Sequence, residues 1–133
     1  MKKLLVVYSV GYAGRELDDL VALLLDRDVR ALVDVRRFPK SKYPCYNREE
    51  LEKTLRKHGI RYVFLGDYLG GFRGGYERYM NTRDYREGIG KLMEIAEKGG
   101  VAIMCRERKT KGCHRRYICR TLREMGVRLV DIE

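Results

Sequence analysis

The sequence has no long apolar run, no secretory leader and no internal repeat. Its longest apolar stretches, such as LLVVYSV and LVALLL, fall far short of the roughly 20 residues that a membrane span requires. The chain has 133 residues and 44% apolar content, and no low-complexity tract divides it, which predicts one domain (residues 1–133) with one packed core. We therefore expect a soluble, cytoplasmic protein without a membrane partner.

Tryptophan is absent and Gln and Asn are scarce, whereas Lys, Arg and Glu are abundant, a composition that leans towards a hyperthermophile. The four cysteines could make two disulfides in an exported protein, but because an export signal is lacking we expect them to be reduced. In a hyperthermophile a disulfide would still be compatible with the sequence.

Acidic residues are too few to balance the basic ones, since 29 Lys and Arg stand against 19 Asp and Glu and give a formal charge of +10. Such a surplus favours an acidic partner. Two basic clusters each follow a predicted strand, so we expect the charge to be focused on one edge of the sheet; a generic basic surface is the alternative. The clusters are Arg106, Arg108, Lys109, Lys111, Arg115, Arg116 and Arg120, and Arg36, Arg37, Lys40 and Lys42.

Strand and helix patterns alternate along the whole chain. This alternation predicts an α/β three-layer sandwich with a mostly parallel five-stranded sheet, right-handed crossovers and helices on both faces. We expect the strand order 3-2-1-4-5. The predicted strands cover residues 4–10, 30–35, 60–65, 101–105 and 127–132, and the predicted helices cover residues 15–26, 47–58, 83–98 and 113–125.

Polar residues and glycines mark the predicted helix ends. Asn47 followed by Glu50 is close to a capping box, and Thr82 is a predicted N-cap. Gly59 is a predicted C-terminal cap.

Residues 66–80, GDYLGGFRGGYERYM, fit no regular element and predict a mobile loop over the carboxyl edge of the sheet. We expect Gly70, Gly71 and Tyr79 of this loop to contact an anionic ligand. The aromatic residues around the loop either pack in the core or a lid, or stack on nucleic-acid bases. They are Tyr62, Tyr68, Phe72, Tyr76 and Tyr79.

The stretch VAIMCRERKTKGCHRRYICR is where we expect the chemistry. Cys105 ends a predicted buried strand, and the next helix is predicted to begin at Cys113. Unpaired N–H groups and the positive dipole end at a helix start suit an anion and favour thiolate over thiol. The first turn of this helix is predicted to include Cys113, His114 and Arg115. We predict catalytic roles for Cys105, Glu107 and His114, and anion-binding roles for Cys113, Arg115 and Arg116.

Two other strand ends contribute to the predicted site. In the expected strand order, Gly11, Tyr12 and Cys105 meet at the switch point between strands 1 and 4. Asp34 and Arg36 lie on the same side of their strand. They either form a salt bridge at the strand end or orient a guanidinium towards a phosphate or carboxylate.

The cysteines also have plainer interpretations. Cys105 is otherwise a small buried hydrophobe, and Cys45 and Cys119 look ordinary. Neighbours on a helix do not face each other, so we expect His114 to serve Cys105 or a ligand rather than Cys113. A zinc site has suitable ligand types in Cys105, Cys113, His114 and Glu107, but its spacing matches no usual motif and Arg115 and Arg116 would oppose a cation; we predict no metal and no cofactor.

Several pieces occur in one order over nearly the whole chain: VGYAG, LVDVRRFPKSK, YNREEL, IRYVFLGDYLGG, YM, and MCRE followed by CHRR. In these pieces the sequence resembles the domain of unknown function 488 family. It departs from that family at Tyr12 and Ala13, where His and Ser are common, and at RKTKG between the two cysteines, where a short acidic turn with proline is common. The resemblance implies the fold and a site, but no reaction.

Three functions follow from the residues. The first is a small enzyme whose Cys105, Glu107, His114 and Arg36 act on an anionic, phosphate-bearing or nucleic-acid substrate. The second is a non-catalytic module that binds DNA or RNA through the basic edge. The third is a metal or structural thiol site.

Overall fold

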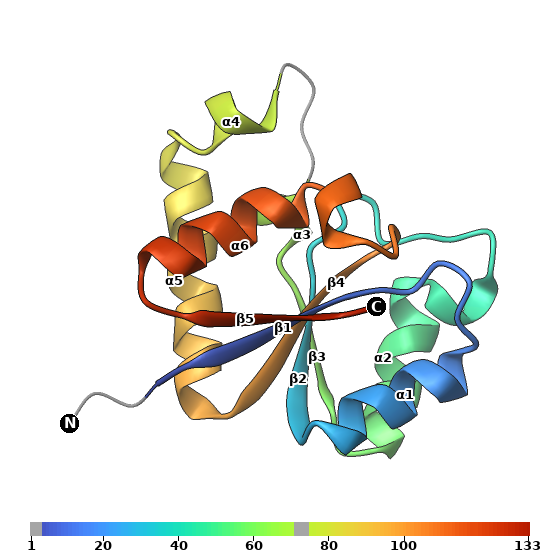
Figure 1. Ribbon diagram of the computed structural model, residues 1–133. Helices are drawn as coiled ribbons and strands as arrows, with labels where there is room; N and C mark the ends of the chain where they lie inside the picture. The colour runs from blue at the N-terminus through green and yellow to red at the C-terminus, as the bar shows by residue number, and fades with distance from the viewer. Residues whose placement is uncertain (1–3, 71–74) are drawn as a thin grey trace.

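The computed structural model describes residues 4–70 and 75–133. Its 5-stranded sheet has only parallel neighbours and lies between two layers of helices (Figure 1). The predicted α/β class is therefore confirmed. The strands are β1 (Val6–Gly11), β2 (Val29–Asp34), β3 (Arg61–Phe64), β4 (Gly100–Cys105) and β5 (Arg128–Ile132). The helices are α1 (Leu17–Asp26), α2 (Arg48–Lys57), α3 (Gly66–Leu69), α4 (Tyr76–Tyr79), α5 (Arg83–Lys98) and α6 (Arg115–Glu124), with short turns η1 (Pro44–Tyr46) and η2 (Thr110–Gly112).

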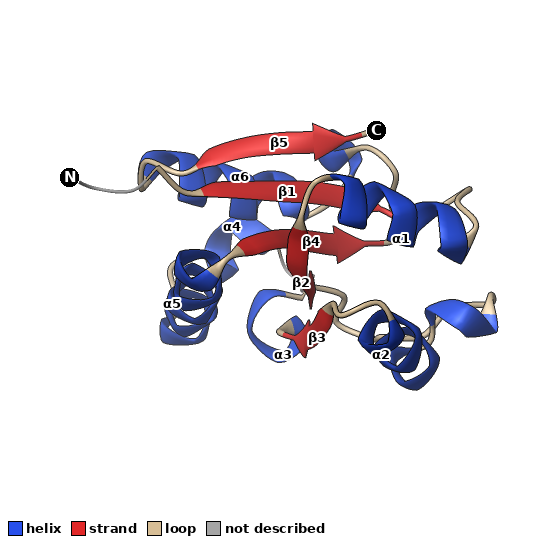
Figure 2. Cartoon of the chain, turned by 90° about the horizontal axis from the view of Figure 1, so that it is seen from below, coloured by secondary structure: helices blue, strands red, loops and turns tan. Residues whose placement is uncertain are grey.

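The strand order is β3-β2-β4-β1-β5, so the expected order 3-2-1-4-5 is wrong in the positions of strands 1 and 4 (Figure 2). Every residue of β4 after Gly100 is buried, whereas β1 has two partly exposed positions, and the more completely apolar strand takes the centre. The two strands are still neighbours, and their register pairs Gly11 with Cys105. On its other side β4 pairs with β2, where Met104 lies opposite Asp34.

Side-chain alternation divides the core between the two sides of the sheet. Helices α1 and α2 cover one side, here called the α1/α2 face; helices α5 and α6 cover the other, the α5/α6 face (Figure 2). The core of the α1/α2 face includes Leu20, Leu24, Leu32, Leu51, Leu55, Ala102 and Met104. The core of the α5/α6 face includes Val33, Val35, Leu92, Ile103, Cys105, Cys113, Ile118 and Leu122.

The helix ends follow the sequence only in part. Thr82 caps α5, since its hydroxyl accepts a hydrogen bond from the Tyr85 backbone N–H at 3.3 Å. Gly59 follows α2 with φ of 74°, a conformation that favours glycine. Asn47 holds the N-cap position of α2, but its side chain accepts from the Ser41 backbone N–H at 2.6 Å and makes no cap bond. The predicted capping box is therefore wrong, because the preceding loop uses that side chain.

Two further expectations about local structure are corrected. Of residues 66–80, which were predicted to fit no regular element, the described ones include two short helices, α3 and α4; residues 71–74 lie outside the described part of the chain. Tyr76 ties these helices together, because its hydroxyl donates to the Leu69 carbonyl at 2.8 Å. Helix α6 begins at Arg115, so Cys113 precedes the first turn in an extended conformation, with φ of −137°. Among the helices of residues 4–70 and 75–133, none has the length and apolar character needed to span a bilayer.

Gly11 lets the loop after β4 lie against the end of β1, because a Cβ there would overlap the backbone carbonyl of Glu107. We expect Gly11→Ala to lower the free energy of unfolding by about 1–3 kcal/mol through overpacking. Gly90 is the matched control, since it lies exposed within α5 and no atom of the described residues comes within 4 Å of an added Cβ, and Gly90→Ala should raise stability by up to about 1 kcal/mol. Urea denaturation measures both changes, and a neutral Gly11→Ala would contradict the close approach.

Candidate thiol site at the carboxyl edge of the sheet

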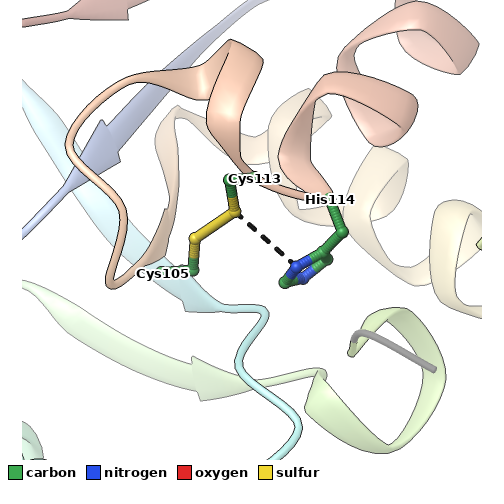
Figure 3. Close-up of side chains that lie close together, drawn as sticks. All are labelled: Cys105, Cys113 and His114. Carbon is green, nitrogen blue, oxygen red and sulfur yellow. Dashed lines mark hydrogen bonds between the residues drawn. A yellow bond between two sulfur atoms is a disulfide. The ribbon is translucent and has the colours of Figure 1, made fainter. Parts of the chain in front are cut away.

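Cys105 and Cys113 meet on the α5/α6 face. Cys105 ends β4, and Cys113 follows the turn η2, so the loop between them brings the two side chains back towards each other (Figure 3). The structure joins them in a disulfide with Cα atoms 7.8 Å apart. The expectation of reduced cysteines is therefore wrong for this pair, while Cys45 and Cys119 are free. Only 2% of Cys105 and 6% of Cys113 is exposed, so the pair is enclosed.

His114 points its imidazole at the sulfur atoms (Figure 3). Its Nε2 lies 2.8 Å from the Val35 carbonyl oxygen and its Nδ1 lies 3.6 Å from Cys113 Sγ. A carbonyl only accepts hydrogen bonds, so Nε2 carries the proton of the neutral ring and Nδ1 directs its lone pair at the sulfur. Burial lowers the pKa of His114, although the Val35 bond raises it, so the ring is neutral at neutral pH. The sequence predicted that His114 would serve Cys105 or a ligand rather than Cys113, but its Nδ1 lies against Cys113 Sγ, because Cys113 does not belong to the helix.

Arg115 is buried completely, with 0% of its surface exposed. Its Nε donates to Cys105 Sγ at 3.1 Å, and its two terminal nitrogens donate to Ser9 Oγ and to the Glu107 backbone carbonyl. Burial lowers the pKa of the guanidinium. In the described part of the chain no carboxylate forms an ion pair with it. The guanidinium of Arg115 therefore interacts with Cys105 and is shielded from solvent.

A chain of hydroxyl groups leads from Arg115 to a carboxylate on β5. Ser9 Oγ accepts from the guanidinium at 2.9 Å and lies 2.8 Å from Thr110 Oγ1, whose hydroxyl donates to Asp131 Oδ1 at 2.8 Å. Because the Thr110 hydrogen is used on Asp131, Ser9 must donate to Thr110. Sequence reasoning missed these three residues; the only signal was a serine at a buried position of an otherwise apolar strand.

The other charged residues of this loop are exposed. Glu107 places Oε2 3.4 Å from Cys105 Sγ, so this carboxylate is within reach of the sulfur. Arg116 turns away from the disulfide and donates to the Lys111 carbonyl at 3.1 Å and to the Tyr117 hydroxyl at 2.6 Å. The predicted groups thus separate into Glu107 near the sulfurs and Arg116 at the surface.

Asp34 and Arg36 form a buried bidentate salt bridge. Of the two alternatives for these residues, a salt bridge at the strand end or a guanidinium oriented towards a ligand, the structure shows the salt bridge. Nε of Arg36 donates to Oδ1 at 2.9 Å and Nη2 donates to Oδ2 at 2.7 Å, while Nη1 donates to the Tyr46 carbonyl at 2.8 Å. Burial lowers the pKa of Arg36, but its bonds to Asp34 outweigh that effect and leave the pKa raised. The Tyr62 hydroxyl also donates to Asp34, at 2.6 Å, and burial raises the pKa of Tyr62.

The structure divides the predicted site between the two faces of the sheet. Asp34 and Arg36 lie with Tyr12 on the α1/α2 face, where the Arg36 guanidinium is 5.4 Å from the Tyr12 ring centre. The cysteines lie on the α5/α6 face. Gly11 and Tyr12 meet β4 through their backbone, since the Tyr12 N–H donates to the Cys105 carbonyl at 3.1 Å. The Val35 carbonyl, which accepts from His114, joins the loop after β2 to the thiols.

Two of the residues predicted to contact an anion, Gly70 and Tyr79, also have structural contacts. A Cβ on Gly70 would lie 2.6 Å from Arg37 Cα, so this glycine lets α3 approach the loop after β2. Tyr79 is buried and donates to the Tyr68 carbonyl. The buried ring of Tyr76 lies 5.4 Å from that of His114, which fits the core-packing alternative. Gly71 and Phe72 lie outside the described residues.

A surface hollow of about 320 Å³ lies among the loops after β1, β2 and β4. Of the described residues that line it, none is acidic, and three are cations from the two basic clusters: Lys40, Lys42 and Arg106. Tyr43, which is 54% exposed, forms part of its rim, and the Lys42 ammonium lies 5.3 Å from the Tyr43 ring centre. The two basic clusters therefore meet at the predicted edge.

We expect Asp34→Asn to lower the free energy of unfolding by about 3–5 kcal/mol, because it leaves the Arg36 guanidinium buried without its anion. Asp28→Asn is the control: it removes the exposed Asp28–Arg30 pair, whose side chains are 85% and 71% exposed, and should cost at most about 1 kcal/mol. Chemical denaturation of both variants measures the difference. Similar small losses would show that the buried pair does not hold the strand end.

A comparison with known protein families gives a match over most of the chain. The family whose sequence model matches is described as a domain of unknown function, DUF488, and the match covers residues 16–75 and 70–122. These segments contain the Asp34–Arg36 pair and the loop from Cys105 to Arg115. No curated protein matches the chain. Because the matched segments cover most of the sequence, from before β2 to within α6, the chain belongs to the domain of unknown function DUF488 family.

Proposed function

We propose that this chain is a small thiol enzyme in which reduced Cys105 attacks an anionic substrate. The observation that carries the proposal is Arg115, a fully buried guanidinium whose Nε donates to Cys105 Sγ at 3.1 Å. A buried cation without a carboxylate partner is costly, and a thiolate at Cys105 would supply the missing negative charge. Arginine beside a cysteine is one of the environments that make a thiol nucleophilic.

The nucleophile forms when the disulfide is reduced. A dithiol reductant supplies two electrons and two protons and is itself oxidised to a disulfide, which leaves Cys105 and Cys113 as thiols. Glu107 Oε2, 3.4 Å from Cys105 Sγ, is the nearest base for the proton of Cys105. Cys113 keeps its proton and donates it to the Nδ1 lone pair of His114, 3.6 Å away. The two sulfurs thereby take different roles: Cys105 is the nucleophile, and Cys113 stays a protonated thiol that donates a hydrogen bond to His114.

The charge of the loop favours an anionic substrate, with phosphate-bearing compounds and nucleic acid as the candidates. Arg106, Arg108, Lys109 and Lys111 lie exposed between the two cysteines. The only acidic residue in that loop is Glu107. Such a cation cluster draws an anion towards this loop.

In protein reduced with a dithiol, we expect iodoacetamide at pH 7 to modify Cys105 or Cys113 faster than Cys45 or Cys119. Burial raises the pKa of Cys119, which keeps it inert, and phosphate or sulfate should slow the reaction at the loop. Arg115→Met should reduce the rate of alkylation of Cys105 by about tenfold or more, which corresponds to a rise of one unit or more in the pKa of its thiol. Peptide mass spectrometry reads each cysteine separately.

Arg116→Met is the matched control, since Arg116 is exposed and its guanidinium bonds to Lys111 and Tyr117 instead of a sulfur. Because Arg115→Met removes a buried residue, circular dichroism checks its fold. Ser9→Ala, which frees one terminal nitrogen of Arg115, gives a milder version of the same test. Equal rates at all four cysteines, or an unchanged rate in Arg115→Met, would remove the enzyme proposal.

A second candidate function is polyanion binding without chemistry. The hollow lined by Lys40, Lys42 and Arg106 favours it, because these cations converge there and the described residues of the lining include no acid. Exposed Tyr43 and Phe38, 54% and 73% exposed, offer faces on which bases can stack. A nucleic-acid strand would use the cations for its phosphates.

We expect affinity for a generic oligonucleotide to fall linearly with the logarithm of salt concentration. Charge reversal to Glu at Arg108, Lys109 and Lys111 should weaken binding at low salt and flatten the slope by about one unit for each phosphate that the variant no longer neutralises. Fluorescence anisotropy measures both. Reversal of three exposed cations on α2, Lys53, Arg56 and Lys57, changes the net charge by the same amount and is the control. An absence of binding at low salt would remove this candidate.

A further inference from the structure

We propose that Cys105, Cys113 and His114, once the disulfide is reduced, bind a thiophilic divalent ion such as zinc. The inference shares with the proposed function the need for a reduced pair, and it adds a means of regulation, because the ion occupies the sulfur of the nucleophile. The relevant site is the cluster in Figure 3, two sulfur atoms and one ring nitrogen on the α5/α6 face.

The three donor atoms are already close enough to share an ion. Cys105 Sγ, Cys113 Sγ and a ring nitrogen of His114 all lie within 4.8 Å of one another. Ligands bound to one tetrahedral zinc at about 2.0–2.3 Å are separated by roughly 3.3–3.8 Å from each other. Small side-chain rotations therefore suffice to bring the three atoms around one ion.

His114 is held in the tautomer that a metal requires. The Val35 carbonyl fixes the hydrogen on Nε2, which leaves the lone pair of Nδ1 directed at Cys113 Sγ, 3.6 Å away. A metal-bound histidine commonly donates its other N–H to a backbone carbonyl or carboxylate in this way, which sets the tautomer and the ring orientation. The orienting partner is thus in place before any ion binds.

The backbone spacing of the cysteines also favours a shared ligand. Their Cα atoms are 7.8 Å apart. Most disulfides join Cα atoms about 4.4–6.8 Å apart. The wider spacing leaves room for the two sulfurs to part and admit an ion between them.

The charges around the cluster call for a divalent cation. Two thiolates and the Glu107 carboxylate carry three negative charges, against one positive charge on Arg115, so a divalent ion makes the group neutral. Arg115 does not exclude the ion, because it donates through Nε to Cys105 Sγ at 3.1 Å and through its backbone N–H to Cys113 Sγ at 3.5 Å. Hydrogen bonds to ligand sulfurs are part of the surroundings that tune a metal site. Arg116, which the sequence also set against a metal, faces away.

Three protein ligands leave the fourth position of a tetrahedral ion open to water or to an anion. The chemical class is therefore a soft or borderline divalent ion bound by two thiolates and one imidazole. While bound, it would hold Cys105 Sγ and keep it from reacting with a substrate.

The test is a metal titration of the full chain, reduced, freed of metal with a chelator and then supplied with zinc in competition with a chromogenic chelator. We expect one zinc per chain, and cobalt(II) in its place should give the intense thiolate-to-metal absorption of a tetrahedral site. Cys105→Ser, Cys113→Ser and His114→Gln should each weaken binding by about 10–100-fold or more. The chain supplies matched controls in Cys45→Ser, Cys119→Ser and His58→Gln, which should bind as the wild type does.

The absence of stoichiometric binding, or an equal loss in the control variants, overturns the inference; circular dichroism confirms that each variant is folded. Alkylation of Cys105 with and without zinc separates this result from the proposed function. If zinc does not bind and reduced Cys105 still reacts rapidly, only the metal site is removed. If zinc binds and metal-free Cys105 is inert, only the nucleophile is removed.

Discussion

The arrangement at the carboxyl edge depends on the buried guanidinium of Arg115. Its donors must all find acceptors inside the protein, and they reach the end of β4 through Cys105, β1 through Ser9 and the following loop through the Glu107 carbonyl. One side chain at the start of α6 thereby fixes the loop that carries both cysteines. The hydroxyl chain from Ser9 through Thr110 extends this network to Asp131 on β5. The buried charge is thereby linked to a carboxylate through hydrogen bonds, and among the described residues no ion pair holds it directly.

The sequence was sufficient for the five strands and the long helices, because these depend on local patterns, but it missed the short helices α3 and α4 and placed the start of α6 too early. The apolar run before Cys105 marked β4, and the hydroxyl of Thr82 marked the start of α5. Strand order does not depend on local patterns, since a crossover helix can pass over one strand or none. The greater burial of β4 in the structure accounts for its central place, which the sequence had assigned to strand 1. Asn47 shows the same limit: its residue type suits a cap, but Ser41, six positions earlier, competes for its oxygen.

Register between strands explains why the predicted site separates into two. Alternation along β2 places Asp34 and Arg36 on the same side of the sheet, as the sequence indicated. Whether Cys105 lies on that side too depends on how β2 is paired with β4. Asp34 lies opposite Met104, so Cys105, the next residue, faces the other way. The salt bridge consequently stabilises the α1/α2 face, and the thiol loop is left with Arg115, which the sequence had assigned to a ligand.

The oxidation state of the cysteines determines how well Arg115 is satisfied. A disulfide sulfur is neutral and a weak acceptor, so in the oxidised form the Nε–H of a fully buried cation faces little negative charge. In the proposed function, reduction supplies a thiolate at the same position. In the proposed metal-bound form, Cys105 Sγ would keep a negative charge within hydrogen-bond distance of Arg115 Nε. With Cys105 as the proposed thiolate, the guanidinium would stabilise the reduced pair more than the oxidised one and make the disulfide more oxidising, as in redox pairs whose thiolate is stabilised. In the proposed function and the proposed metal site, the residue that organises the loop would therefore also favour the reduced state of its cysteines.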